Sequence, residues 1–213
     1  MTSNKTVFFV IGTLLIILGL FMLIPYGVQI FYEENSHSFL SSSFITILIG
    51  VLFVLANLQE KYQLNLKQTF LFSTLTWISV ALFGSIPFIL SDINFSLSDS
   101  FFESMSGITT TGSTVITDLD NSPKSILIWR AIMQWLGGVG IIVMAITVLP
   151  LLKVGGMQLF KIESSDKPEK ILPRASQVAF IIISTYLILT LFCAFFYKIL
   201  GMNIFDSIAH AMT

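Results

Sequence analysis

The chain of 213 residues is 54% hydrophobic and only 11% charged, with a mean hydropathy of +0.87; since soluble domains are about 25% charged, this composition indicates a membrane protein. A formal net charge of −1 offers no basic surface for nucleic acid. The single cysteine, Cys193, excludes an intrachain disulfide and a cysteine-based metal site, and the presence of only two histidines argues against zinc or haem chemistry.

Five segments are long and apolar enough to cross a bilayer as helices, which takes about 20 residues. They are residues 7–30, 39–58, 69–90, 126–152 and 178–200. The first segment is too long for the apolar region of a signal peptide and ends without a small-x-small cleavage site, so we expect it to be a retained span. The sequence therefore predicts an all-α membrane protein with five transmembrane helices.

Basic residues are divided unequally between the two sets of alternating connectors. One set holds eight of the 11, and the other holds Lys124, Arg130 and Lys198. Because cytoplasmic connectors carry the excess of lysine and arginine, we predict a multi-pass protein with a cytoplasmic N-terminus. The outer face is then acidic, which favours attraction of cations. The eight residues are Lys5, Lys61, Lys67, Lys153, Lys161, Lys167, Lys170 and Arg174.

The connector between the third and fourth spans, residues 91–125, contains a short amphipathic segment at residues 97–108. We expect a helix here that is too short to span, capped by Ser98 or Asp99, with Glu103 near its middle. A short helix that returns through irregular chain is typical of a re-entrant loop. Irregular backbone at membrane depth is tolerated only where protein or a water-filled cavity covers it.

Residues 107–114, GITTTGST, follow this helix directly. A potassium ion passing a narrow filter exchanges its water for rings of backbone carbonyls, and glycine allows the backbone conformations that such rings need. The helix would aim its partly negative C-terminal end at the cation. We therefore predict a filter strand at Thr109, Thr110, Thr111, Gly112 and Ser113. The alternative is a serine- and threonine-rich external turn.

The chain contains an internal repeat with an offset of 107 residues. Residues 99–105 align with residues 206–212, and each copy follows an apolar span. This order predicts two N-terminal spans at 1–68, a first span–pore–span unit at 69–152, a cytoplasmic loop at 153–177 and a second unit at 178–213. The second unit stops before a filter strand, so we expect the chain to be the N-terminal part of a longer design.

Other residues of the predicted pore unit have two interpretations each. Arg130 either snorkels to the interface or forms an ion pair with Glu103 or another outer carboxylate behind the filter. Gly137, Gly138 and Gly140 either allow close helix packing or form a hinge for gating. Asp99 and its equivalent, Asp206, are predicted to lie at helix N-termini, where the helix dipole favours a carboxylate.

Three stretches together carry a resemblance to a known family. They are FFESMSGITTTGS at 101–113, WRAIMQWLGGVGI at 129–141 and LLKVGGMQLF at 151–160. The chain resembles the TrkH/KtrB family of bacterial potassium uptake proteins, of the TrkH type, over essentially its whole length. In that family four span–pore–span units surround one filter, whereas this chain holds one unit and the start of a second.

The resemblance implies an inner-membrane location and potassium as the transported ion, with the carbonyls of Thr110 and Thr111 as ligands. It also implies a homodimer of the full-length protein, a cytoplasmic nucleotide-binding regulatory subunit and contact with membrane lipid. No catalytic constellation is evident, so no enzyme activity and no covalently bound cofactor are expected. The predicted function is potassium uptake by channel-like permeation as the pore-forming subunit of a Trk-type system. The alternative is a non-conducting fragment that binds full-length or regulatory subunits.

Overall fold

The computed structural model describes residues 4–59, 66–93, 95–152 and 175–213. These residues form helices, and no strand occurs among them. The helices are α1 (Lys5–Phe21), α2 (Leu23–Phe31), α3 (Ser38–Ala56), α4 (Leu66–Gly84), α5 (Ile86–Ile89), α6 (Leu97–Ile108), α7 (Lys124–Leu152), α9 (Ala175–Ile199) and α10 (Ile204–Met212). The chain divides into two compact units, residues 1–137 with 212–213, and residues 138–211.

Five helical segments in the described part are long and apolar enough to cross a membrane, which agrees with the predicted all-α membrane fold. The first and third spans are interrupted, at Met22 and Ser85. Pro25 and Pro87 lie just beyond these breaks, and a proline cannot donate a hydrogen bond to the carbonyl four residues earlier. The spans are Lys5–Phe31, Ser38–Ala56, Lys67–Ile89, Lys124–Ile142 and Ala179–Ile199.

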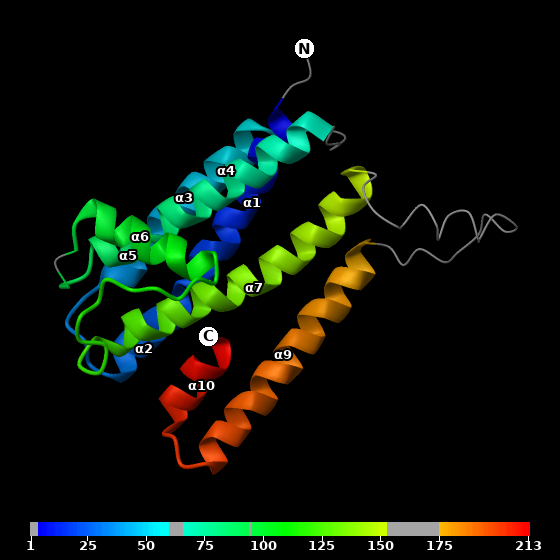
Figure 1. The fold of residues 1–213 in the computed structure, drawn as a ribbon. Coiled ribbons are helices and arrows are strands. Elements are labelled where there is room, and N and C mark those ends of the chain that lie inside the picture. The colour runs from blue at the N-terminus through cyan, green and yellow to red at the C-terminus, as the bar shows by residue number, and fades with distance from the viewer. Residues whose placement is uncertain (1–3, 60–65, 94, 153–174) are drawn as a thin grey trace, which may run out of the picture. The chain divides into compact units, whose positions relative to one another are not determined.

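Small residues bring α1 and α3 into close contact in the first unit, where α4 also packs along α1 (Figure 1). A Cβ placed on Gly12 would lie 2.7 Å from the carbonyl oxygen of Gly50. Farther along, Ser43 Oγ donates a hydrogen bond to the Gly19 carbonyl over 2.7 Å. Membrane helices associate through such close approaches, because lipid is as apolar as their side chains.

Trp129 anchors the first part of α7 within this unit. Its side chain is fully buried, and its indole Nε1 donates to the Gly84 carbonyl over 3.0 Å. The ring of Phe39 from α3 meets it edge-on, with centroids 6.0 Å apart. Gly84 ends α4, so the free carbonyl at the α4–α5 break finds its donor on α7 rather than in its own helix.

Two contacts show that the connectors alternate as predicted. Gln59 Nε2 donates to Thr6 Oγ1 over 3.5 Å, which joins the N-terminus to the second connector. Glu34 binds Ser125, which joins the first connector to the third. The side of the membrane on which each pair lies remains a prediction. The division of the chain at 68, 152 and 177 into four functional segments also remains a prediction. Residues 153–174, most of the predicted cytoplasmic loop, lie outside the described residues.

Candidate functional site: the loop after α6

Helix α6 covers the predicted residues, but the expectation that Ser98 or Asp99 caps it is wrong. The N-cap is Ser96, whose Oγ accepts a hydrogen bond from Asp99 N over 3.1 Å. In return Asp99 Oδ2 accepts from Ser96 N over 3.2 Å. Asp99 is thus the third residue of a capping box, in the first turn, where the helix dipole favours its charge.

The chain unwinds in steps after Ile108. Thr109 N donates to the Met105 carbonyl over 3.0 Å, and Thr110 N donates to the Gly107 carbonyl over 2.9 Å. Both Thr111 N and Gly112 N then reach the Ser106 carbonyl, over 3.0 and 3.3 Å. These bonds fold the predicted filter segment back against the last turn of α6.

Two residues of this segment have positive φ, with 59° at Thr110 and 76° at Gly112. Glycine adopts this region without a steric penalty, whereas a β-branched threonine there is a strained exception. Residues 110 and 112 therefore have left-handed backbone, whereas residue 111 between them has an ordinary negative φ. Such strain at a non-glycine residue persists only where the surroundings impose it.

The hydrogen bonds of the segment use its N–H groups and leave several carbonyl oxygens available. Within the part of the chain that the structure describes, no donor is assigned to the carbonyls of Thr110, Thr111 and Gly112. All three residues are exposed. The threonine hydroxyls behave differently, because Thr109 Oγ1 and Thr111 Oγ1 bond each other at 2.9 Å. The segment can thus present backbone oxygens to a cation.

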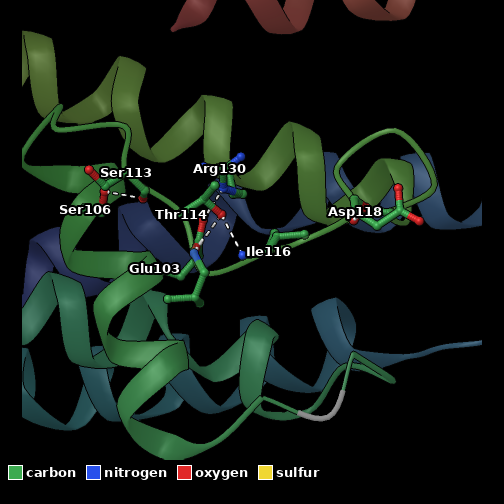
Figure 2. Close-up of polar contacts among 9 residues, drawn as sticks. Glu103, Ser106, Ser113, Thr114, Ile116, Asp118 and Arg130 are labelled. Atoms are coloured by element: carbon green, nitrogen blue, oxygen red, sulfur yellow. Dashed lines mark hydrogen bonds and ion pairs between the residues drawn. The ribbon is translucent and has the colours of Figure 1, made fainter.

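Two side chains of α6 hold the residues that follow. Ser106 Oγ donates to the Ser113 carbonyl over 2.6 Å. Glu103 Oε2 accepts from Thr114 Oγ1 over 3.1 Å and from Val115 N over 3.0 Å. Figure 2 shows both connections between the helix and the irregular segment that follows it. The segment from Thr109 to Val115 is therefore fixed to α6 at both ends.

Glu103 also carries an ion pair with Arg130 of α7 (Figure 2). The glutamate side chain is fully buried, and the arginine side chain is 13% exposed. The geometry favours the predicted pairing over an arginine that snorkels away. One carboxylate therefore joins three parts of the site, namely α6, the segment that follows α6, and α7.

The three glycines of α7 have different surroundings. A Cβ on Gly137 would lie 2.0 Å from the Ile108 carbonyl oxygen, so the end of α6 rests directly on this glycine. In the second unit, a Cβ on Gly138 would lie 2.7 Å from the Tyr186 hydroxyl. Apart from its own helix, no described residue comes within 4 Å of the corresponding point on Gly140. Close packing is thus evident at Gly137, and a role in gating remains a prediction.

The second copy of the repeat begins with the same local geometry as the first. Asn203 Oδ1 accepts from Asp206 N over 2.8 Å, and Asn203 Nδ2 donates to the Asp206 carboxylate. Asp206 therefore lies in the first turn of α10, as predicted, at the place of Asp99. Ser207, like Ser100, is buried.

Sequence reasoning missed three contributors, namely Ser96, Ser106 and Thr114. The pattern Ser-x-x-Asp at 96–99 was a detectable signal of the first, because it is a variant of the capping box. No local signal marks Ser106 or Thr114, since their partners lie seven and eleven residues away. Among the described residues, no group of three His, Cys, Asp or Glu side chains could hold a metal ion.

The sequence matches one protein family and several potassium uptake proteins. Residues 35–213 match the family TrkH, described as cation transport protein. The Trk system potassium uptake protein TrkI of Halomonas elongata is 40% identical over 205 residues, which cover 96% of this chain and 42% of TrkI. TrkH of Vibrio parahaemolyticus is 38% identical over 213 residues, covering 98% of this chain and 44% of TrkH.

A solved structure shares the fold as well. The crystal structure of the potassium transporter TrkH from Vibrio parahaemolyticus matches with a TM-score of 0.87 and 35% sequence identity. The match covers 99% of this chain and 42% of that one. The chain therefore spans less than half the length of the relatives it matches.

Proposed function

Because the chain belongs to the TrkH family of cation transport proteins, we propose that it forms part of a potassium uptake pathway. The observation that carries this proposal is the free set of backbone carbonyls at Thr110, Thr111 and Gly112 beside the C-terminal end of α6. Carbonyl dipoles replace the water of a dehydrating potassium ion. The partly negative helix end adds a favourable potential for a cation.

Permeation in this proposal is passive, down the electrochemical gradient. One strand, from Thr109 to Ser113, supplies one side of the filter, and further strands are needed to surround an ion. The buried Glu103, paired with Arg130, holds the returning strand in place without facing the ion. If Arg130 faced the ion, its positive charge would repel the ion. Pairing with Glu103 neutralises this charge and holds the arginine away from the proposed ion path.

The surroundings of the pathway follow from the resemblance to the family. We propose a bacterial inner-membrane protein with a cytoplasmic N-terminus, a re-entrant α6 and a homodimer of the full-length protein. A cytoplasmic nucleotide-binding subunit is proposed as the regulator. The distribution of lysine and arginine supports the orientation, and the exposed apolar side chains of the five spans support contact with lipid.

A second candidate function rests on the length of the match. Since the chain spans 42% of TrkI and 44% of TrkH, the 213 residues alone could act as a non-conducting partner of full-length or regulatory subunits. Reading the gene beyond the codon for Thr213 separates the two cases. Continuation into further filter strands supports the transporter, and co-purification with a full-length homologue without ion flux supports the partner.

The filter assignment is tested by Gly112→Asp in the complete encoded protein, expressed in cells that lack other potassium uptake. We expect rubidium uptake to be abolished, because the φ of 76° disfavours a side chain and a carboxylate would occupy the ion path. The matched control is Gly201→Asp. Gly201 has a φ of 105°, and among the described residues other than its chain neighbours no atom lies within 4 Å of its Cβ position.

The control variant carries at least as much backbone strain, because a φ of 105° also disfavours a side chain. We expect it to lower membrane abundance but to leave the uptake rate per protein unchanged, since Gly201 precedes α10 and lies outside the proposed filter segment. Normal uptake by Gly112→Asp at normal membrane abundance would sink the filter assignment. Equal loss in both variants would show that the aspartate acts through folding at a strained position rather than through the ion path.

A further inference from the structure

Glu34, in the connector between α2 and α3, caps the first turn of α7. Its Oε1 accepts a hydrogen bond from Ser125 N over 3.1 Å, and its Oε2 accepts one from the Ser125 hydroxyl. The two residues are separated by 91 positions in the chain. Both carboxylate oxygens are therefore committed to a single residue at the start of the span that carries Arg130.

Ser125 needs an acceptor from outside its own helix. The first N–H groups of a helix have no intrahelical partner. Ser125 is the second residue of α7, and the hydrogen bonds to the Pro123 carbonyl begin only with Ile126 and Leu127. Ser125 is only 1% exposed, so water cannot readily replace the missing acceptor. A carboxylate at this position also suits the positive end of the helix dipole.

The connector that carries Glu34 is itself held firmly. Glu34 N donates to the carbonyl of Gln29 over 2.9 Å. Gln29 is buried, and its Nε2 donates to Ser38 Oγ at the start of α3 over 3.2 Å. The carboxylate is thus presented by a braced turn between two packed helices rather than by a free loop.

The cap lies at one end of a short series of contacts that leads to the filter segment. Five residues after Ser125, Arg130 pairs with Glu103, which in turn binds Thr114 and Val115. The cap fixes the first turn of α7, and with it the axial position and rotation of the helix. These in turn fix the position of the Arg130 guanidinium. A shift there would move Arg130, and through Glu103 it would reach Thr114 and Val115.

We propose that Glu34 is a positioning residue for the filter, through which the two N-terminal helices set the geometry of the pore unit. This inference rests on the proposed function for its transport consequence, and on the contacts above for its structural part. The match to the family model begins at residue 35, whereas the matches to TrkH of Vibrio parahaemolyticus cover 98% of the chain in sequence and 99% in structure. In this proposal the two N-terminal helices affect ion binding by positioning α7.

The test compares Glu34→Gln, Glu34→Asp and Glu33→Gln in the complete encoded protein. Glu33 is the matched control, because it is the exposed neighbour in the same connector and its substitution removes the same charge. Two measurements are made on each variant, the KM and maximal rate of rubidium uptake, and hydrogen–deuterium exchange of peptides covering 125–130 and 109–116.

For Glu34→Gln we expect the KM for rubidium to rise at least about threefold with the maximal rate per protein nearly unchanged, and faster exchange in both peptides. Glu34→Asp should recover part of both effects, since it keeps the charge with a shorter reach. Glu33→Gln should match the parent protein. A purely structural role would lower abundance and leave the KM unaltered.

The proposal is overturned if Glu34→Gln and Glu33→Gln give the same KM, or if exchange rises at 125–130 without any change at 109–116. Failure of the proposed function is distinguishable, because the parent protein itself would then show no saturable rubidium uptake. In that case the exchange data alone decide whether the cap at Ser125 is coupled to residues 109–116.

Discussion

Glu103 is the residue on which the site depends most heavily. Its side chain is fully buried, and both carboxylate oxygens are occupied, one by Arg130 and the other by Thr114 and Val115. A buried charge is tolerated only when it is paired and its remaining lone pairs are satisfied. This single side chain therefore couples α6 to residues 114 and 115 and to α7.

Removing one partner of the Glu103–Arg130 pair should strongly destabilise the protein. We expect Glu103→Gln to lower the free energy of unfolding by about 3–5 kcal/mol, because Arg130 is left buried without a counter-charge. Thermal denaturation of the detergent-purified protein measures this. The double variant Glu103→Gln with Arg130→Gln should lose less than the sum of the two single changes, since no uncompensated charge remains.

Asp120→Asn is the control for this experiment, because Asp120 is an exposed carboxylate in the loop between α6 and α7. It should change stability by less than about 0.5 kcal/mol. Additive effects of the Glu103 and Arg130 substitutions would contradict a direct interaction between them.

At the scale of the helices, the contact between α6 and α7 is set by backbone proximity. Gly107 also faces α7, since its Cβ position would lie 3.0 Å from Met133 Cβ. The carbonyl of Ile108 closes against Gly137. The end of α6 can approach α7 this closely only because these positions carry no side chain. Helix packing thereby determines where the proposed filter segment, which starts at Thr109, begins.

A methyl group at Gly137 should disturb this arrangement. We expect Gly137→Ala to destabilise the protein by about 1–3 kcal/mol or more and to lower rubidium uptake, because the obstructing atoms are backbone and cannot rotate away. Gly140→Ala is the matched control in the same helix. Its added methyl group would meet no described residue outside its own helix within 4 Å, and alanine raises helix propensity by about 1 kcal/mol.

The midpoints of thermal denaturation and the initial rates of rubidium uptake are compared between Gly137→Ala and Gly140→Ala. A Gly137→Ala protein as stable and as active as Gly140→Ala would show that α6 can shift without consequence for the filter segment.

At the scale of the whole molecule, alternating connectors and unequal basic charge define the topology. Contacts between Gln59 and Thr6, and between Glu34 and Ser125, join connectors that the alternation assigns to the same side. The excess of lysine and arginine in one set then predicts which side is cytoplasmic. Asp118 and Asp120 would lie on the outer side, where they contribute to a potential that attracts cations.

This topology predicts the labelling of single cysteines. With Cys193→Ser as background, Asn35→Cys should react with a membrane-impermeant maleimide added to intact spheroplasts. Lys167→Cys should react only after permeabilisation. Both positions should remain reactive in the permeabilised sample, which serves as the control for side-chain access. The reverse pattern would invert the proposed orientation.

The sequence alone determined the five spans, the extent of α6, the alternation of connectors and the resemblance on which the function rests. These features depend on apolar length, charge distribution and local motifs, which are properties of neighbouring residues. The prolines at 25 and 87 also carried a local signal for the breaks that interrupt two spans.

Only the tertiary structure decided that Arg130 pairs with Glu103, that Gly137 receives the end of α6 and that Glu34 caps α7. Each of these contacts joins residues 27 or more positions apart. Hydropathy and motif spacing report the environment of a residue but not its distant partner. The partner is selected by how the helices pack, which burial and hydrogen-bond satisfaction decide for the chain as a whole.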